Sequence, residues 1–301
     1  DGFVRPTMQP WMLTEVTDTS KIHERNPYFW KVDPEGRQLP YIDRIVTGIA
    51  DPETINLKIV AGEVDLDYGV VNVNNYALYK ENETAGGYVT KELDLQGESK
   101  VAFAVNQTID DPIKRPVFQD LRFRQALSLA IDADEVNETV FFGLGRPMAF
   151  PVVGTSFHIP KWDNNPADAF DADQANQLLD AVGLASRSGD GWRLGSDGEI
   201  FTVTIEGRQG GEVSVPIESL ELIKEYWQEV GLKTEIKISE RSLHIERRDG
   251  NLIEINTGPF MLGSEARQYM IDREFWAQGS QDLSWAPHWG CLLYTSPSPR
   301  D

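Results

Sequence analysis

Residues 118–145 read FQDLRFRQALSLAIDADEVNETVFFGLG, and this stretch contains two consecutive helix signals. Asp120 precedes the first apolar run and can accept a hydrogen bond from the free backbone N–H groups of a helix N-terminus. Asp132 and Glu135 form an Asp-x-x-Glu capping pattern for a second helix, and Gly143 is suited to ending it. The stretch therefore predicts two short helices that follow one another directly.

Strand-like and helical patterns alternate on both sides of this stretch. Helical patterns cover 51–62, 171–183 and 216–231, and strand-like patterns cover 42–49, 63–69, 101–107, 199–207, 232–238 and 251–260. Phe201, Val203 and Ile205 recur at every second position, which indicates a strand with one buried face, entered from a hairpin turn with the sequence GSDG. The alternation of strands and helices predicts an α/β fold with at least partly parallel sheets.

The composition limits the classes of function. The chain has 301 residues and a formal net charge of -20, so binding to nucleic acid or to an anionic membrane surface is not expected. Its one cysteine, Cys291, excludes a disulfide framework. The four histidines have no ligand-like spacing, so we expect neither a metal nor another cofactor.

The sequence contains none of the common catalytic motifs, but one class of enzyme, a hydrolase that uses paired carboxylates, remains an alternative. There is no Gly-x-Ser-x-Gly elbow and no phosphate-binding loop that ends in Gly-Lys. The acid pairs Asp65/Asp67 and Asp110/Asp111 could serve a carbohydrate-active hydrolase, which needs two carboxylates that face one cleft. Because 48 acidic residues produce such pairs by chance, we expect the chain not to be an enzyme.

Five segments, taken in order, resemble the family 5 extracellular solute-binding proteins. They are RPTMQPW at 5–11, ERNPYFWKVDPEGRQLPYIDRI at 24–45, DPETINLKIVAGEVDLDYG at 51–69, DLRFRQALSLAIDADEV at 120–136 and FDADQANQLLDAVGL at 170–184. Any one match could arise by chance, but five in family order are specific. The resemblance implies the substrate-binding component of an ATP-driven importer, which captures peptides or oligosaccharides and delivers them to the transmembrane permease.

The resemblance also implies where such a protein works and what it meets. We expect a periplasmic or extracellular monomer, which a lipid anchor could attach to the membrane. Besides the hydrolase, a second alternative to the importer component is a ligand-sensing binding protein that is not coupled to import.

The fold implied by the resemblance is a periplasmic-binding-protein-like two-lobe fold of the class II type, with an incomplete first lobe. The expected division is 1–107 for the last part of the first segment of lobe I, 108–252 for lobe II, 253–290 for the return into lobe I, and 291–301 for a tail. The linking strands would be 101–107 and 251–256. Ligand would then bind between the lobes, which close around it.

The tail 291–301 reads CLLYTSPSPRD and resembles the translation of a sequencing-library adapter. We therefore expect it to be an artefact joined to a truncated metagenomic fragment, and to contribute nothing to fold or function. A Ser/Pro segment without periodicity is in any case not expected to pack.

Arg208 and Gln209 follow the alternating strand and stand in a Gly-rich loop. In the resembled family an arginine in this region can pair with a ligand carboxylate, a contact that suits the planar guanidinium. A solvated loop arginine is the equal alternative.

Two other places could face the cleft. The return crossing carries Asn256, Thr257 and Phe260, where the family often has an acid that binds a peptide amino terminus. No Asp stands there, so short-peptide binding is in doubt, and sugars or long peptides remain. Trp285 and Trp289 could stack on sugar rings or peptide side chains, with burial in the core as the equal alternative.

Overall fold

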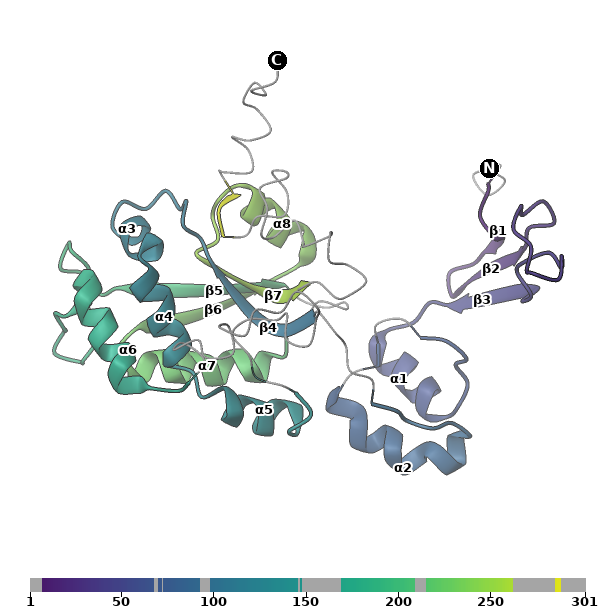
Figure 1. Cartoon of the computed structure of the whole chain (residues 1–301), viewed down its shortest axis with the longest axis horizontal. Coiled ribbons are helices and arrows are strands. Elements are labelled where there is room, and N and C mark those ends of the chain that lie inside the picture. The colour runs from purple at the N-terminus through teal and green to yellow at the C-terminus, as the bar shows by residue number, and fades with distance from the viewer. Residues whose placement is uncertain are drawn as a thin grey trace, which may run out of the picture. The chain divides into compact units, whose positions relative to one another are not determined.

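The computed structural model describes residues 7–67, 70–71, 73–92, 98–145, 147, 169–208, 215–261 and 285–287, with the side chains of 98–100 and 259–261 left out. The chain divides into two compact units, Asp1–Thr90 and Lys91–Asp301 (Figure 1). Each unit has its own sheet.

The first unit is a small antiparallel sheet followed by two helices. The sheet has the order β1-β2-β3, and both strand pairs in it are antiparallel. The elements are β1 (Trp11–Val16), β2 (Ser20–Arg25), β3 (Arg44–Gly48), α1 (Pro52–Val60), the 3-10 turn η1 (Val73–Asn75) and α2 (Tyr76–Gly86). Among the described residues of this unit, the buried hydrophobic side chains are those of Ile22 and Tyr79.

The second unit is built on a four-stranded mixed sheet with the order β4-β7-β5-β6. Its strands are β4 (Glu98–Val105), β5 (Thr202–Arg208), β6 (Lys233–Ser239) and β7 (Ile255–Met261). Its helices are α3 (Lys114–Gln119), α4 (Leu121–Leu129), α5 (Ala133–Phe141), α6 (Ala172–Leu179) with the π-helical turn η4 (Asp180–Leu184), α7 (Ile217–Glu229) and α8 (Arg241–Asp249). Strand β5 runs parallel to β6 and β7, and β4 runs antiparallel to β7, which confirms the expected partly parallel α/β sheet.

The two helices predicted at 118–145 form as α4 and α5, with α3 directly ahead of them. The Asp120 carboxylate accepts a hydrogen bond from Arg122 N at 2.9 Å, and the Asp132 carboxylate accepts one from Glu135 N at 3.0 Å. Both caps supply acceptors that the first helical turn lacks. At the end of α5 the left-handed backbone begins one residue before the expected glycine, because Phe142 already has a φ of 56° and Gly143 follows at 71°.

Replacing Asp132 with Ala is expected to lower the free energy of unfolding by about 1 kcal/mol, because the N–H of Glu135 loses its acceptor. Asp134→Ala is the matched control, since it removes the same charge from the first turn of α5 without removing a cap. Urea denaturation of both variants measures the difference. Equal losses in the two variants would show that charge, and not the cap, stabilises the helix start.

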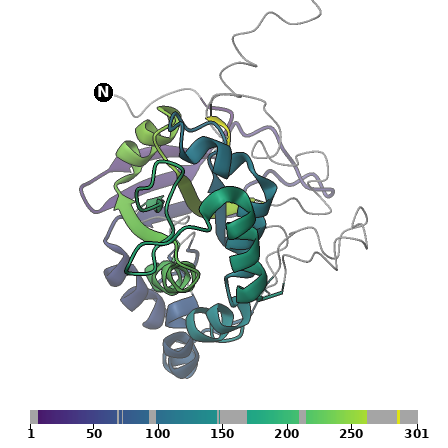
Figure 2. The same cartoon turned by 90° about the vertical axis from the view of Figure 1, so that its left-hand side faces the viewer.

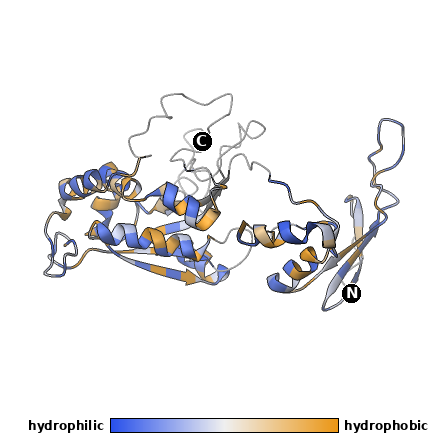
Figure 3. Cartoon of the chain, turned by 90° about the horizontal axis from the view of Figure 1, so that it is seen from below, coloured by the Kyte–Doolittle hydropathy of each residue, from blue (hydrophilic) through white to orange (hydrophobic). Residues whose placement is uncertain are grey.

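The sheet of the second unit has one apolar and one polar face. On the apolar face, Val203 and Ile205 pack with α4, α6 and α7, and the ring of Phe103 lies 5.4 Å from that of Trp227. Figures 1 and 2 show α7 and α8 on opposite sides of this sheet. The helices alternate hydrophilic and hydrophobic residues, as expected of amphipathic helices that cover a core (Figure 3).

The polar face carries the residues that alternate with that core. Glu206 and Arg208 point to the side opposite Val203 and Ile205, because successive strand residues face opposite ways. Asn256 stands opposite Glu206 in the β5–β7 register and so shares this face. Helix α8 lies over it, and its Arg247 bonds Glu206.

One sequence prediction about a strand is corrected by the structure. The described residues 63–67 of the expected strand 63–69 form no strand, and the Asp67 carboxylate accepts hydrogen bonds from Val70 N and Val71 N instead.

The expected hairpin at GSDG forms and is short. Leu194 and Ile200 make an antiparallel bridge, Gly195 N donates to the carbonyl of Glu199 at 2.8 Å, and Phe201 N donates to the carbonyl of Arg193 at 2.8 Å. Beyond it, β5 pairs in parallel on both sides.

The expected division into lobes at 107/108 and 252/253 stays a prediction. The two linking segments lie side by side in the second unit, where β4 and β7 pair with Ala104 opposite Asn256. The side chain of Asn106 fastens them further, since its amide donates to the side chain of Asn251 and to the carbonyl of Ile253, each at 2.9 Å. The tail 291–301 lies outside the described residues.

Candidate functional site

The ends of β5 and β6, marked by Arg208 and Ser239, form the candidate site and are called the carboxyl edge below. These two residues stand opposite one another in the parallel register. The chain leaves β5 toward α7 on one face of the sheet and leaves β6 toward α8 on the other (Figure 1). Ligands of open α/β sheets bind outside the carboxyl ends of strands where the connections diverge in this way.

Arg208 is the last residue of β5 and is partly buried. Gly207 directly before it is tightly enclosed, because a Cβ there would lie 3.1 Å from side-chain atoms of both Ile238 and Thr257. The glycine therefore allows the three parallel strands to pack closely at the carboxyl edge. This close packing holds the backbone of Arg208 in place, while Gln209 lies outside the described residues.

The residues predicted on the return crossing separate onto two faces. Asn256 is buried on the polar face with Glu206. Thr257 is buried on the other face, where its hydroxyl donates to the carbonyl of Ala102 at 3.1 Å. Phe260 continues β7 opposite Ser99, and its side chain lies outside the description.

The two predicted tryptophans lie near the C-terminal end of the sequence. The carbonyl of Trp285 accepts a hydrogen bond from Gln107 N at 2.8 Å, which fixes its backbone next to the end of β4. Trp289 lies outside the described residues.

A buried ion pair close to Arg208, between Glu206 and Arg247, was not predicted from the sequence. The carboxylate of Glu206 accepts two hydrogen bonds from Arg247, from Nε and from Nη2, each at 2.7 Å. Lys237 on β6 lies 3.7 Å from the same carboxylate. Glu206 is 2% exposed, so this bidentate pair fixes α8 on the polar face of β5 within a low-dielectric environment.

His244 of α8 also escaped the sequence analysis and is 5% exposed. Burial lowers the pKa of its imidazole, and the charges of Arg248 and Arg208 lower it further. Interactions with Asn256 and Glu206 oppose this shift and raise the pKa, but burial prevails. The imidazole is therefore neutral at pH 7. Because no helix is predicted at 241–249 from the sequence, nothing there pointed to this histidine in advance.

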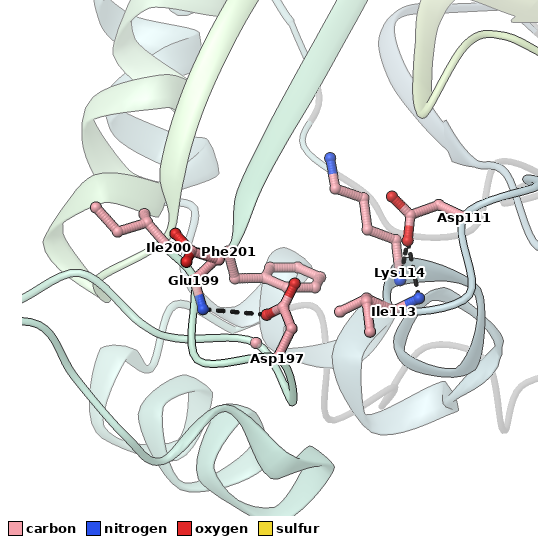
Figure 4. A pocket seen from close by; sticks show the side chains of 8 residues that line it. Asp111, Ile113, Lys114, Asp197, Glu199, Ile200 and Phe201 are labelled. Atoms are coloured by element: carbon pink, nitrogen blue, oxygen red, sulfur yellow. Dashed lines mark hydrogen bonds between the residues drawn. The ribbon is translucent and has the colours of Figure 1, made fainter.

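A small pocket lies at the other end of β5 (Figure 4). Its volume is about 70 Å³, and its lining residues are Asp111, Ile113, Lys114, Gly195, Asp197, Glu199, Ile200 and Phe201. Phe201 at the pocket is separated from Arg208 by about 23 Å, because seven steps along the strand of roughly 3.3 Å each join them.

The two aspartates that line that pocket accept hydrogen bonds from the backbone. Asp111 accepts from Ile113 N and Lys114 N, and Asp197 accepts from Glu199 N. Asp110 pairs with Arg115 at 2.5 Å. The acid pair Asp110/Asp111 considered for a hydrolase thus serves turns and helix starts.

The described residues contain no cluster of three or more His, Cys, Asp or Glu side chains able to hold a metal ion. Within the same residues no helix has the length and hydrophobicity that crossing a membrane requires.

A family model described as "Bacterial extracellular solute-binding proteins, family 5 Middle" matches residues 6–274. Among curated proteins, the chain is 29% identical over 228 residues to the oligopeptide-binding protein AppA of Bacillus subtilis, a match that covers 75% of the chain and 38% of AppA. It is 26% identical over 200 residues to a periplasmic alpha-galactoside-binding protein of Rhizobium meliloti, covering 62% and 28%. The chain thus spans well under half the length of the curated relatives it matches.

Solved structures with the same fold include binding proteins for two kinds of ligand. An oligopeptide-binding protein OppA superposes with a TM-score of 0.58 at 34% identity, over 90% of this chain and 43% of that one. The periplasmic binding protein MelB of Agrobacterium fabrum, in complex with stachyose, gives a TM-score of 0.70 at 19% identity, over 94% and 44%. At 19% identity, the similarity to MelB shows a shared fold and nothing about function.

Proposed function

Because the chain belongs to the bacterial extracellular solute-binding proteins of family 5, we propose that it captures a peptide or an oligosaccharide outside the cytoplasm and delivers it to the permease of an ATP-driven importer. AppA, named as an oligopeptide-binding protein, and the alpha-galactoside-binding protein of Rhizobium meliloti support both ligand classes. We further propose that the protein works as a monomer without catalysis. Attachment to the membrane by a lipid anchor is compatible with this role.

The observation that carries the proposal is the polar face at the carboxyl edge. Arg208, Glu206 and Asn256 share one face of a sheet whose other face is a closed apolar core. Enclosed polar groups at a switch point favour a ligand that supplies matching hydrogen-bonding groups. Peptides and oligosaccharides both do so, through amides and carboxylates in one case and hydroxyls in the other.

Within the site, we propose that Arg208 and Gln209 contact ligand carboxylate or hydroxyl groups and that Asn256 adds an amide contact. Phe260, Trp285 and Trp289 would supply apolar and stacking surface. Thr257 is withdrawn from this set, because its hydroxyl bonds Ala102 on the opposite face of the sheet. The lack of an Asp at 256–261 still argues against short peptides, whose amino terminus would meet no carboxylate at that crossing.

Calorimetric titration with a nonapeptide and with stachyose tests this function, with mass spectrometry of the ligand after incubation. Saturable binding of at least one probe, with that probe recovered intact, is the result that supports capture without catalysis. Cleavage of stachyose during incubation would instead support a hydrolase. Failure of both probes to bind would contradict capture of these ligand classes by the chain.

A further inference from the structure

His244 occupies a position that packing alone does not explain. Glu240 caps α8, so His244 is the fourth residue of the helix and Ser239 is the residue before the cap. Side chains at these two positions meet across the first helical turn, where they are usually both apolar. Here both are polar and more than nine-tenths buried. Within the described part of the chain, neither His244 Nδ1 nor Ser239 Oγ has a hydrogen-bond partner.

Charged groups from three elements surround this histidine. From β5, Glu206 and Arg208 act on it with opposite signs, and from its own helix Arg248 acts as a cation. The negative charge of Glu206 is already shared between Arg247 of α8 and Lys237 of β6. Asn256 faces it from β7 and brings a dipole without a charge. Arg248 also pairs with Asp249 at 3.0 Å. A proton on His244 therefore adds a cation on which both Arg208 and Arg248 act unfavourably.

We propose that His244 takes up a proton when an anionic group of a ligand binds beside Arg208. The proposal rests on the proposed function, because it assigns a role to the same site. The ligand's negative charge offsets the cations around His244, and Nδ1 offers a nitrogen that no described group occupies. The proton comes from solvent, and no bond other than N–H forms. The ligand class that fits is a peptide with a free carboxylate or a sugar acid.

The sign of the linkage follows from the direction of the shift. In the free chain burial holds the pKa of His244 below its usual range, and a ligand anion raises that pKa. Binding consequently takes up a proton between the two pKa values, and affinity is lost as pH rises through the pKa of the complex. A rise of about half to one unit corresponds to roughly three- to tenfold tighter binding on the acidic side of this window.

The first test needs no ligand. The imidazole resonances of His244 in the 301-residue chain are titrated by NMR, alongside the Arg208→Gln variant and the control variant Arg122→Gln, which removes the same charge from α4. We expect the pKa of His244 to rise in Arg208→Gln and to match that of the unmodified chain in Arg122→Gln. An unchanged pKa of His244 would overturn the proposal, since it would mean that the two groups are not coupled.

The second test measures the proton itself. A nonapeptide with a free carboxyl terminus and the same peptide with a C-terminal amide are titrated calorimetrically near pH 6, in two buffers of different ionisation enthalpy. We expect proton uptake with the free acid, little with the amide, and none with the free acid in His244→Gln. Binding of the free acid without proton uptake would refute the proposal. Failure of both peptides to bind would instead contradict the proposed capture of peptides and remove the basis of this inference with it.

Discussion

Replacing Glu206 with Gln is expected to lower the free energy of unfolding by about 1.5–3 kcal/mol. The carboxylate is buried and receives two 2.7 Å hydrogen bonds from Arg247, with Lys237 at 3.7 Å. An amide of the same size leaves the partly exposed guanidinium of Arg247 without its anion. The loss should appear as a lower midpoint of urea unfolding.

Glu221→Gln is the matched control, because the same substitution there breaks an exposed ion pair with Lys224 on α7. Its expected cost is about 0–1 kcal/mol. The double variant Glu206→Gln with Arg247→Met should recover part of the loss, since the guanidinium is then no longer left without its anion and only the more exposed Lys237 loses a partner. Equal costs for Glu206→Gln and Glu221→Gln would contradict the view that the bridge from β5 to α8 is a buried structural element.

Replacing Arg208 with Ala is expected to weaken ligand binding roughly ten- to a hundredfold, because a hydrogen bond to a charged group contributes about 1.5–3 kcal/mol. Arg208→Lys should recover only part of the affinity, since an ammonium cannot make the planar two-point contact. Calorimetric titration of the chain and both variants, with the nonapeptide and with stachyose, measures the effect.

The control for this series is Arg122→Ala, which removes the same charge from a partly exposed ion pair with Asp120 on α4. Its affinity should match that of the unmodified chain. Thermal melting of the Arg208 variants separates the two roles open to this side chain. Equal affinities across the series would take Arg208 out of the site, and a large fall in melting temperature would make it a structural residue.

Much of the fold could be predicted because its signals are local. The caps at Asp120 and Asp132 act within three residues of the group they bond, so the sequence displays them directly. The alternation of Val203 and Ile205 likewise identifies the buried face of β5 without knowledge of its neighbours. The prediction of a strand at 63–69 was wrong for its described residues 63–67, and there the Asp67 carboxylate accepts hydrogen bonds from Val70 N and Val71 N.

The carboxyl edge could be predicted only in part, because its chemistry depends on distant partners. Arg208 follows a recognisable strand, but Glu206 occupies a position that the alternation assigns to solvent. Its burial depends on Arg247, which lies 41 residues later in the chain. His244 belongs to a helix so polar that the sequence suggested no element there, and its burial arises from the packing of α8 on β5.

The position of a bound ligand is the most direct test of this account. Hydrogen exchange of the chain is measured by mass spectrometry with and without saturating nonapeptide or stachyose. The account predicts slower exchange at the carboxyl edge, around 206–208 and 239–244, with little change around 111–114 and 195–201. Protection confined to those last two segments would place the ligand in the pocket at the opposite end of β5 and contradict the account.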